Sequence, residues 1–151
     1  MVLHLAQTNV SRLRYPPADP GSAEVLAATD RVNRLAARAP GYVWHLRTHV
    51  GEDERLIVNV SVWTSYARLH EFTYRTAHNH YIRRQRQWFE PVAQPSTVLW
   101  WLPAGTLPTV EDAITRLRHL RTYGPSPSAF SLRVRFDADG HREPVPQRSA
   151  R

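Results

Sequence analysis

The sequence predicts an α+β fold in which an antiparallel sheet carries helices on one face. Three observations lead to this class. Apolar and polar residues alternate in stretches such as 56–63, which is the period of a strand. Other stretches repeat apolar residues at the helical period of about 3.6 residues. Proline- and glycine-rich breaks separate these stretches, and 151 residues suit one domain with a real core.

The first predicted elements are a strand over residues 2–10 and a helix over about 22–38. Three prolines and a glycine make residues 15–21 a loop between them. The helix is indicated by apolar side chains at helical spacing, and Pro40-Gly41 ends it.

A hairpin and a helical region follow. Strands over 42–49 and 55–63 flank a polar turn at 51–54, so the two strands pair with each other. Thr64 or Ser65 then caps a helical region that runs to about residue 89, with a candidate break near residues 76–79.

The last predicted elements are a strand over 97–103, a helix and a final strand. Thr109-Val110-Glu111-Asp112 resembles a capping box that opens a helix ending before Gly124. Residues 129–136 alternate and predict a half-exposed edge strand. We expect residues 1–136 to form the single domain and the proline- and arginine-rich residues 137–151 to be a disordered tail.

The predicted order of elements is β-α-β-β-α-β, with an extra C-terminal helix and strand. This is the split β-α-β pattern of ferredoxin-like folds. One face of such a sheet carries the helices, and the other face must be solvated or covered. The candidate residues of the open face are Tyr42, Trp44, Leu46, Asn59, Ser61, Trp63, Leu99 and Trp101. Their tryptophans are too much apolar area for water, so we expect a homodimer with a cavity in each half.

Composition excludes several classes of function. The chain has no cysteine, which excludes disulfides, thiolate metal sites and cysteine nucleophiles. The formal charge is +7, but all 20 basic residues are arginines spread along the chain, so we expect no nucleic-acid partner. No apolar run has the length of a membrane span and no leader is visible, which favours a cytoplasmic protein without a membrane partner.

One strand carries the most unusual side chains. Asn59, Ser61 and Trp63 alternate with valines, which places an amide, a hydroxyl and an indole in one row. A buried amide without a partner costs about 1–3 kcal/mol, so some group must satisfy it. That group is either a ligand oxygen or a cross-strand side chain such as Gln7 or Asn9.

The tryptophans allow two interpretations. Trp44, Trp63 and Trp101 could stack a flat aromatic ligand, with about 0.5–1.5 kcal/mol per pair beyond burial. They could equally form a dimer core. We expect His45 and His49, which flank the exposed hairpin, to be solvated.

The helical region contributes a histidine and an arginine. His78 and His80 are two residues apart and point in different directions on a helix, so no metal site is expected. His78 alone could ligate a heme iron, act as a general base, or bond the backbone at a helix end. Tyr74, one turn earlier, and Arg83 either form a polar end of the cavity with it or belong to a solvated basic face. In the first case Arg83 could hold a developing oxyanion.

Several motifs together resemble a bacterial family defined as a domain of unknown function, DUF3291. They are His-Leu-Ala-Gln at 4–7, Pro-Gly-Tyr-Val-Trp at 40–44, Val-Asn-Val-Ser-Val-Trp at 58–63, Phe-Thr-Tyr-Arg at 72–75, Arg-Arg-Gln-Arg-Gln-Trp-Phe-Glu at 83–90 and Val-Leu-Trp-Trp-Leu-Pro-Ala-Gly at 98–105. That family resembles the dimeric α+β barrels typified by antibiotic-biosynthesis monooxygenases.

The resemblance implies a small monooxygenase-like enzyme that acts on an aromatic or polyketide-like molecule. In cofactor-free oxygenases of this superfamily, an asparagine and a tryptophan near one strand end and a basic residue on the following helix belong to the site. Asn59, Trp63 and Arg83 match this pattern, and His78 is a further candidate catalytic residue. The expected substrate-binding residues are Trp44, Ser61, Tyr74 and Trp101. No cofactor is needed in this interpretation; the alternatives are a heme protein with His78 as axial ligand and a non-enzymatic small-molecule-binding dimer.

Overall fold

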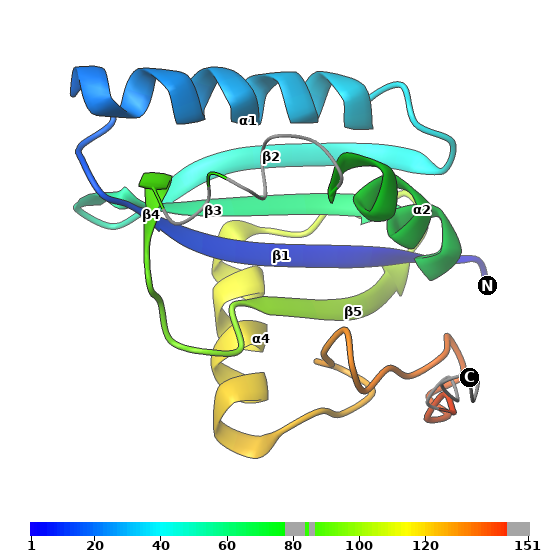
Figure 1. Ribbon diagram of the computed structural model, residues 1–151. Coiled ribbons are helices and arrows are strands. Elements are labelled where there is room, and N and C mark those ends of the chain that lie inside the picture. Colours follow the sequence, from blue (N-terminus) through cyan, green and yellow to red (C-terminus); the bar gives the residue numbers. More distant parts are fainter. Residues whose placement is uncertain (78–83, 85–86, 145–151) are drawn as a thin grey trace, which may run out of the picture.

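Five strands form one antiparallel sheet in the computed structural model, which describes residues 1–77, 84 and 87–144 (Figure 1). β3 lies between β2 and β1, and the far side of β1 pairs with β5 along most of its length and with β4 at one end. The strands are β1 (Leu3–Leu13), β2 (Tyr42–Val50), β3 (Asp53–Trp63), β4 (Phe89–Glu90) and β5 (Thr97–Pro103).

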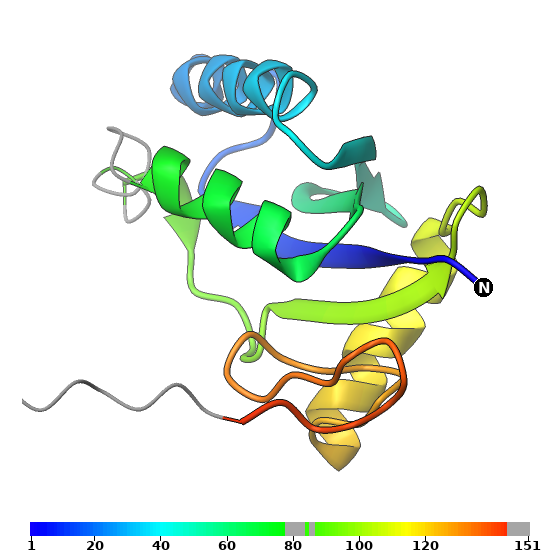
Figure 2. The same ribbon diagram turned by 90° about the vertical axis from the view of Figure 1, so that its right-hand side faces the viewer.

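Helices lie on both faces of this sheet. Figure 2 shows α1 and α2 on one side and α4 on the other. The helices are α1 (Ala23–Ala36), α2 (Tyr66–Ala77) and α4 (Val110–Tyr123), with a 3-10 turn, η1 (Pro20–Ser22), before α1. The predicted ferredoxin-like core with its two helices on one face is confirmed, and the extra C-terminal helix covers the opposite face.

The capping box predicted for the last helix is present. The Thr109 side chain accepts a hydrogen bond of 3.0 Å from the Asp112 backbone N–H, which satisfies one of the unpaired donors of the first turn. At the other end Gly124 adopts φ of 80°, a conformation that favours glycine, and ends the helix.

The valine face of β3 is the main core. Val58, Val60 and Val62 are at most 1% exposed and pack in one cluster with apolar residues of β1, β5 and α4. Leu117 of α4 is 2% exposed in this cluster. The apolar face predicted for this strand is therefore confirmed, and it is covered by the chain's own C-terminal helix.

The opposite face of β3 is also covered, which corrects the prediction of an open face. Asn59, Ser61 and Trp63 lie beneath α1 and α2 and share a cavity with side chains of both helices. The face that we expected a second subunit to cover is therefore covered by the same chain. The expectation of a homodimer loses this support.

A β-bulge in β2 changes which of its side chains face which side of the sheet, so the prediction for this strand was wrong beyond Tyr42. Tyr42 lies opposite Trp63, but the register shifts before Trp44, which lies opposite Val62. Val43 is the extra residue. Trp44 and Leu46 therefore share the side of Val60 and Val62, not that of Trp63, because a bulge changes the face of every residue beyond it.

The strand predicted over residues 129–136 is not formed. Phe130 makes one isolated bridge with Leu99, through backbone hydrogen bonds of 2.8 and 2.9 Å. Ser131 then closes a tight turn, because its side chain accepts the Val134 N–H at 3.0 Å while its own N–H bonds the Val134 carbonyl. Such local serine bonds compete with strand pairing.

Residues 137–144, the first part of the expected tail, fold back on the preceding segment. The Asp137 carboxylate accepts the backbone N–H groups of Asp139 and His141 at 3.0 and 2.9 Å. The Arg135 guanidinium lies 3.0 Å from the Glu143 carboxylate. Residues 145–151 lie outside the described part of the chain.

No helix in the described ranges combines the length and the apolar character needed to cross a membrane.

Removing the α4 contact at Leu117 will destabilise the protein strongly. We expect Leu117→Ala to lower the free energy of unfolding by about 2–5 kcal/mol, because it leaves a cavity in the core. Urea unfolding followed by tryptophan fluorescence measures this change. The control Leu132→Ala, at a side chain 48% exposed, should change the free energy by less than about 0.5 kcal/mol. Equal effects of the two variants would contradict the packing of α4 on the sheet.

A candidate ligand cavity between the sheet and two helices

A cavity of about 450 Å³ lies between the sheet and helices α1 and α2. This volume is in the range of sites that enclose small organic molecules. Its polar floor comes from β1, β2 and β3, and β4 and the start of β5 close one end. The residues that define the floor and walls include Gln7, Asn9, Ser11, Thr29, Val32, Asn33, His45, Asn59, Ser61, Trp63, Leu69, Phe72, Thr73, Thr76, Phe89, Glu90, Gln94 and Thr97.

Two cross-strand pairs make the floor. Gln7 lies opposite Ser61, and Asn9 lies opposite Asn59. The Ser61 hydroxyl donates to the Gln7 side-chain oxygen at 3.3 Å and accepts the Trp63 indole N–H at 3.0 Å. The sequence left open whether a ligand or a cross-strand side chain satisfies these polar groups. For Ser61 the partner is the cross-strand side chain of Gln7.

The asparagine pair differs from the serine pair. Within the described residues no hydrogen-bond partner is found for the side chains of Asn9 and Asn59, although both are half-buried in the cavity. Asn33 of α1 faces the same cavity from above, again without a side-chain partner in that part of the chain. Each primary amide has two N–H donors and an accepting oxygen. Three amides from three elements can therefore hold a ligand that carries several oxygen atoms.

An aromatic wall stands beside these amides. The Trp63 ring is 1% exposed and stacks on Phe72 of α2, with centroids 5.1 Å apart and an interplanar angle of 27°. Tyr42 meets the other side of Trp63 edge-on at 5.9 Å. This cluster fixes the orientation of the indole, which supports the more exposed Phe72 ring at the cavity wall.

His45 is a residue that sequence reasoning missed. We expected it to be solvated, but it lies opposite Ser61, is half-buried and lines the cavity. The Tyr42 hydroxyl lies 2.5 Å from its Nδ1 atom. Burial raises the pKa of the Tyr42 phenol, although a hydrogen bond with the His45 backbone acts in the opposite direction. His49, four residues further on, is exposed as expected.

Three predicted site residues lie outside the cavity lining. Trp44 packs with the core on the α4 side of the sheet. Trp101 lies on the same face as Trp63, but its indole N–H donates to the Phe136 carbonyl at 2.9 Å. Tyr74 is 60% exposed on α2. Of the tryptophans expected to stack a ligand, the structure brings only Trp63 into the cavity.

The remaining predicted residues, His78 and Arg83, lie outside the described residues. The heme alternative and the oxyanion role of Arg83 depend on them and stay predictions. Among the residues that the structure does describe, the one group close enough to share a metal ion is Asp137, Asp139 and His141. It lies at the surface, away from the cavity lining, and its Asp137 carboxylate already accepts two backbone N–H groups.

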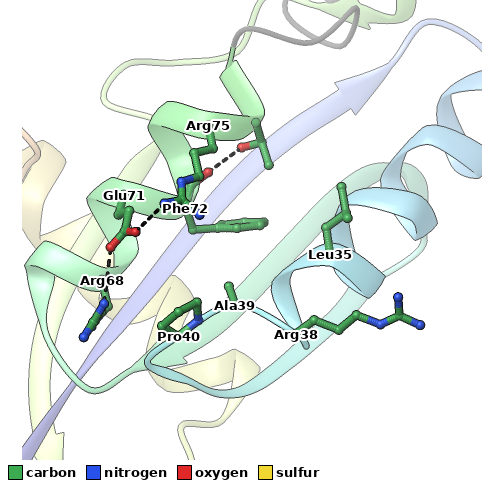
Figure 3. A pocket seen from close by; sticks show the side chains of 9 residues that line it. Leu35, Arg38, Ala39, Pro40, Arg68, Glu71, Phe72 and Arg75 are labelled. Atoms are coloured by element: carbon green, nitrogen blue, oxygen red, sulfur yellow. Dashed lines mark hydrogen bonds and ion pairs between the residues drawn. The ribbon is translucent and has the colours of Figure 1, made fainter.

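A smaller pocket of about 280 Å³ adjoins the cavity between the end of α1 and α2 (Figure 3). Phe72 and Thr76 line both spaces. Figure 3 shows the Phe72 ring pointing across the gap toward Leu35 of α1. Glu71 forms ion pairs with Arg68 and Arg75 at 3.4 and 2.8 Å on the α2 side of this pocket. Phe72 therefore separates the cavity from an outer, arginine-rimmed pocket.

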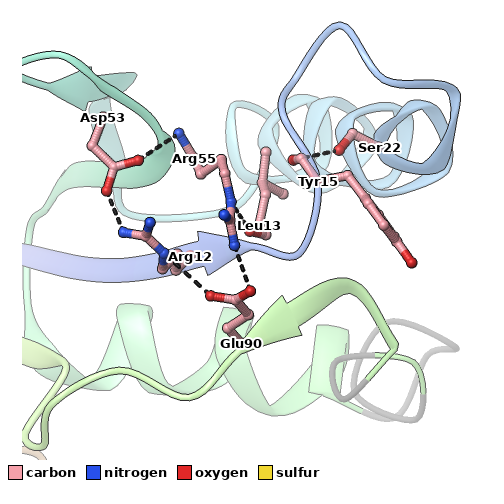
Figure 4. Close-up of polar contacts among 7 residues, drawn as sticks. All are labelled: Arg12, Leu13, Tyr15, Ser22, Asp53, Arg55 and Glu90. Atoms are coloured by element: carbon pink, nitrogen blue, oxygen red, sulfur yellow. Dashed lines mark hydrogen bonds and ion pairs between the residues drawn. The ribbon is translucent and has the colours of Figure 1, made fainter.

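A four-residue ionic cluster lies at the β4 end of the cavity, where its member Glu90 is a lining residue (Figure 4). Arg12 and Arg55 both pair with Glu90, and Arg12 also pairs with Asp53. Arg55 further donates from Nε to the Leu13 carbonyl at 2.9 Å. Because Glu90 lines the cavity, this cluster holds β4 against β1 and keeps that end in place.

The family model for the domain of unknown function DUF3291 matches residues 4–146, so the chain belongs to this family. Its fold is similar to that of solved structures that include candidate antibiotic biosynthesis monooxygenases. A search of curated protein sequences finds no match.

Three solved structures illustrate the fold. A variant of SnoaB, a cofactor-independent oxygenase from Streptomyces nogalater, is 19% identical with a TM-score of 0.51, covering 70% of this chain and 98% of its own. A candidate antibiotic biosynthesis monooxygenase from Nitrosomonas europaea is 15% identical with a TM-score of 0.52, covering 70% and 95%. A protein from Shewanella oneidensis is 12% identical with a TM-score of 0.51, covering 68% and 91%. At these identities the similarity establishes the fold alone.

The ionic cluster makes part of the stability depend on pH. Desolvation acts to raise the pKa of Asp53, but hydrogen bonds from the Arg55 backbone and the Arg12 guanidinium, with both positive charges, lower it on balance. The carboxylate thus stabilises the fold above the pKa of the unfolded chain, and this contribution disappears as the pH falls through the lower folded value. We expect urea midpoints to fall less between pH 7 and pH 3 in Asp53→Asn than in the wild type.

Glu52→Gln is the matched control for this prediction, because Glu52 is exposed in the same turn. It should keep the wild-type pH dependence. An unchanged dependence in Asp53→Asn would show that the cluster does not contribute through this carboxylate.

Proposed function

We propose that this protein is a small, cofactor-independent oxygenase that oxidises a flat, oxygen-rich aromatic or polyketide-like molecule in the cavity beneath α1 and α2. The observation that carries the proposal is the combination of three amides without described partners and an aromatic wall in one cavity. The amides suit phenol and carbonyl oxygens, and the wall suits the ring system. The shared fold with a cofactor-independent oxygenase supports the same class.

The chemistry requires a substrate that can supply electrons to oxygen by itself. Removing a proton from a ring methylene that is conjugated with a carbonyl gives a carbanion that is delocalised onto oxygen. That carbanion can reduce O₂, so a methylene group becomes a carbonyl and the second oxygen atom leaves as water. Asn59 and Asn9 would donate hydrogen bonds to the developing oxyanion. These hydrogen bonds become stronger as negative charge accumulates on that oxygen. Phe72, held in place by its stacking on Trp63, would orient the ring plane of the substrate.

Oxygen consumption with a panel of polyphenols that includes a dihydroxyanthrone tests the proposal. We expect wild-type protein to accelerate uptake, and Asn59→Ala to lower kcat/KM about tenfold or more, because a bond of about 1–3 kcal/mol is lost. Fluorescence quenching measures binding in parallel. Binding without uptake across the panel would favour the alternative of a non-enzymatic binding protein and overturn the proposal.

A matched tryptophan pair separates the cavity from the rest of the same sheet face. Trp63→Phe removes the indole N–H that bonds Ser61, and Trp101→Phe removes the one that bonds Phe136. We expect the first variant to lower kcat/KM severalfold and the second to leave it within about twofold of the wild-type value. Equal losses would place the site elsewhere on this face.

We still propose a homodimer, as the sequence predicted, but the cavity is lined by residues of a single chain and does not require one. Leu46 is 37% exposed beside the half-buried Trp44, on the α4 side of the sheet. Light scattering determines the oligomeric state, and a wild-type protein that is active as a monomer would agree with a cavity built within one chain.

A further inference from the structure

We propose that His45 is the catalytic base of this cavity and that the Tyr42 hydroxyl positions its imidazole ring. The inference rests on the proposed oxygenase function, which needs a group to remove a substrate proton. The sequence predicted Tyr42 only as part of the open sheet face and His45 as solvated, because a histidine next to an exposed hairpin is ordinarily solvated.

The β-bulge in β2 creates this pair. In a regular strand two residues three apart point to opposite faces. Here the register shifts by one residue between Tyr42 and Trp44, so Tyr42 stands opposite Trp63 and His45 stands opposite Ser61. Both therefore share the cavity side of the sheet, and their side chains meet at 2.5 Å. Bulges commonly redirect side chains in this way beside active sites.

The cavity offers few other groups that could take the proton. Among its described lining residues, the ionisable side chains are those of His45 and Glu90. The Glu90 side chain is already engaged in ion pairs with Arg12 and Arg55. His45 has the Tyr42 hydroxyl at Nδ1, and within the described residues no ion pair engages its ring.

The charges around His45 are balanced. Arg47 is the next residue on the same side of β2, and its guanidinium lies 2.8 Å from the Asp30 carboxylate of α1. Tyr42 contributes a neutral phenol, since burial raises its pKa. Neutral imidazole is the form that accepts a proton, and it is the side chain most often used as a general base.

The proposed step moves one proton. The C–H bond of the substrate methylene breaks, its proton goes to the free imidazole nitrogen, and its electron pair stays on carbon as the delocalised carbanion. The Tyr42 oxygen accepts a hydrogen bond from Nδ1–H of the imidazolium, which orients the ring and stabilises its charge. Molecular oxygen, the co-substrate of the proposed reaction, is the oxidant that then consumes the carbanion.

Anaerobic exchange of the dihydroxyanthrone methylene protons with D₂O, followed by NMR, measures this step without oxygen chemistry. We expect wild-type protein to catalyse exchange and His45→Gln to slow it about 100-fold or more, since general-base catalysis contributes about 10²–10⁴-fold. Probe affinity should stay within about twofold, because glutamine retains a polar group of similar length. The matched control His49→Gln, at the exposed histidine of the same strand, should behave as wild type.

The pH profile provides a second readout. Wild-type exchange should fall toward low pH as the imidazole becomes protonated, and His45→Gln should lose this acid limb. Tyr42→Phe should lower the exchange rate with little change in KM and move the limb to lower pH, because the imidazolium loses its hydrogen-bond acceptor.

The outcomes separate this inference from the function it rests on. Exchange by the wild type without oxygen uptake would support the base and overturn the oxygenase. No exchange and no uptake by the wild type would overturn both. His45→Gln could keep the wild-type exchange rate and pH profile, or His78→Gln could lose both instead. Either result would overturn His45 as the base and leave the proposed oxygenase function standing.

Discussion

The pairing of β1 with β3 is the constraint on which the site depends. Opposed residues alternate between apolar pairs, such as Val10 with Val58, and the amide-bearing pair Asn9 with Asn59. A slip of one residue would exchange the two faces and bury the amides against α4. Packing of α4 on the apolar face fixes the register of the β1–β3 pairing. The polar face forms a cavity instead of a packed core.

The helices divide this sheet into a structural side and a functional side. α4 supplies small and branched apolar residues that interlock with the valines of β3. α1 and α2 instead bring Asn33, Thr73 and Thr76 over the amide row, together with Phe72, which stacks on Trp63. Because both faces are covered within one chain, the cavity does not need a second subunit for its floor or its roof.

Irregular features shape the ends of the cavity. The bulge at Val43 turns His45 inward beside Tyr42, and the Arg12–Glu90–Arg55 cluster ties the short strand β4 across the other end. Phe72 stands between the cavity and the outer pocket near Leu35. Polar and aromatic groups are thus distributed around a ligand-sized space, as a site for a flat, oxygenated molecule requires.

The sequence by itself determined the α+β class, the limits of most strands and helices, the capping box at Thr109 and the polar row of Asn59, Ser61 and Trp63. These follow from local periodicity and capping chemistry, which act within a few residues. Only the tertiary structure decided which helix covers which face, that residues 129–136 turn away after Phe130, and that His45 rather than Trp44 faces the cavity. A bulge and a long-range packing choice reverse the facing of a side chain without changing the local pattern that sequence reasoning uses.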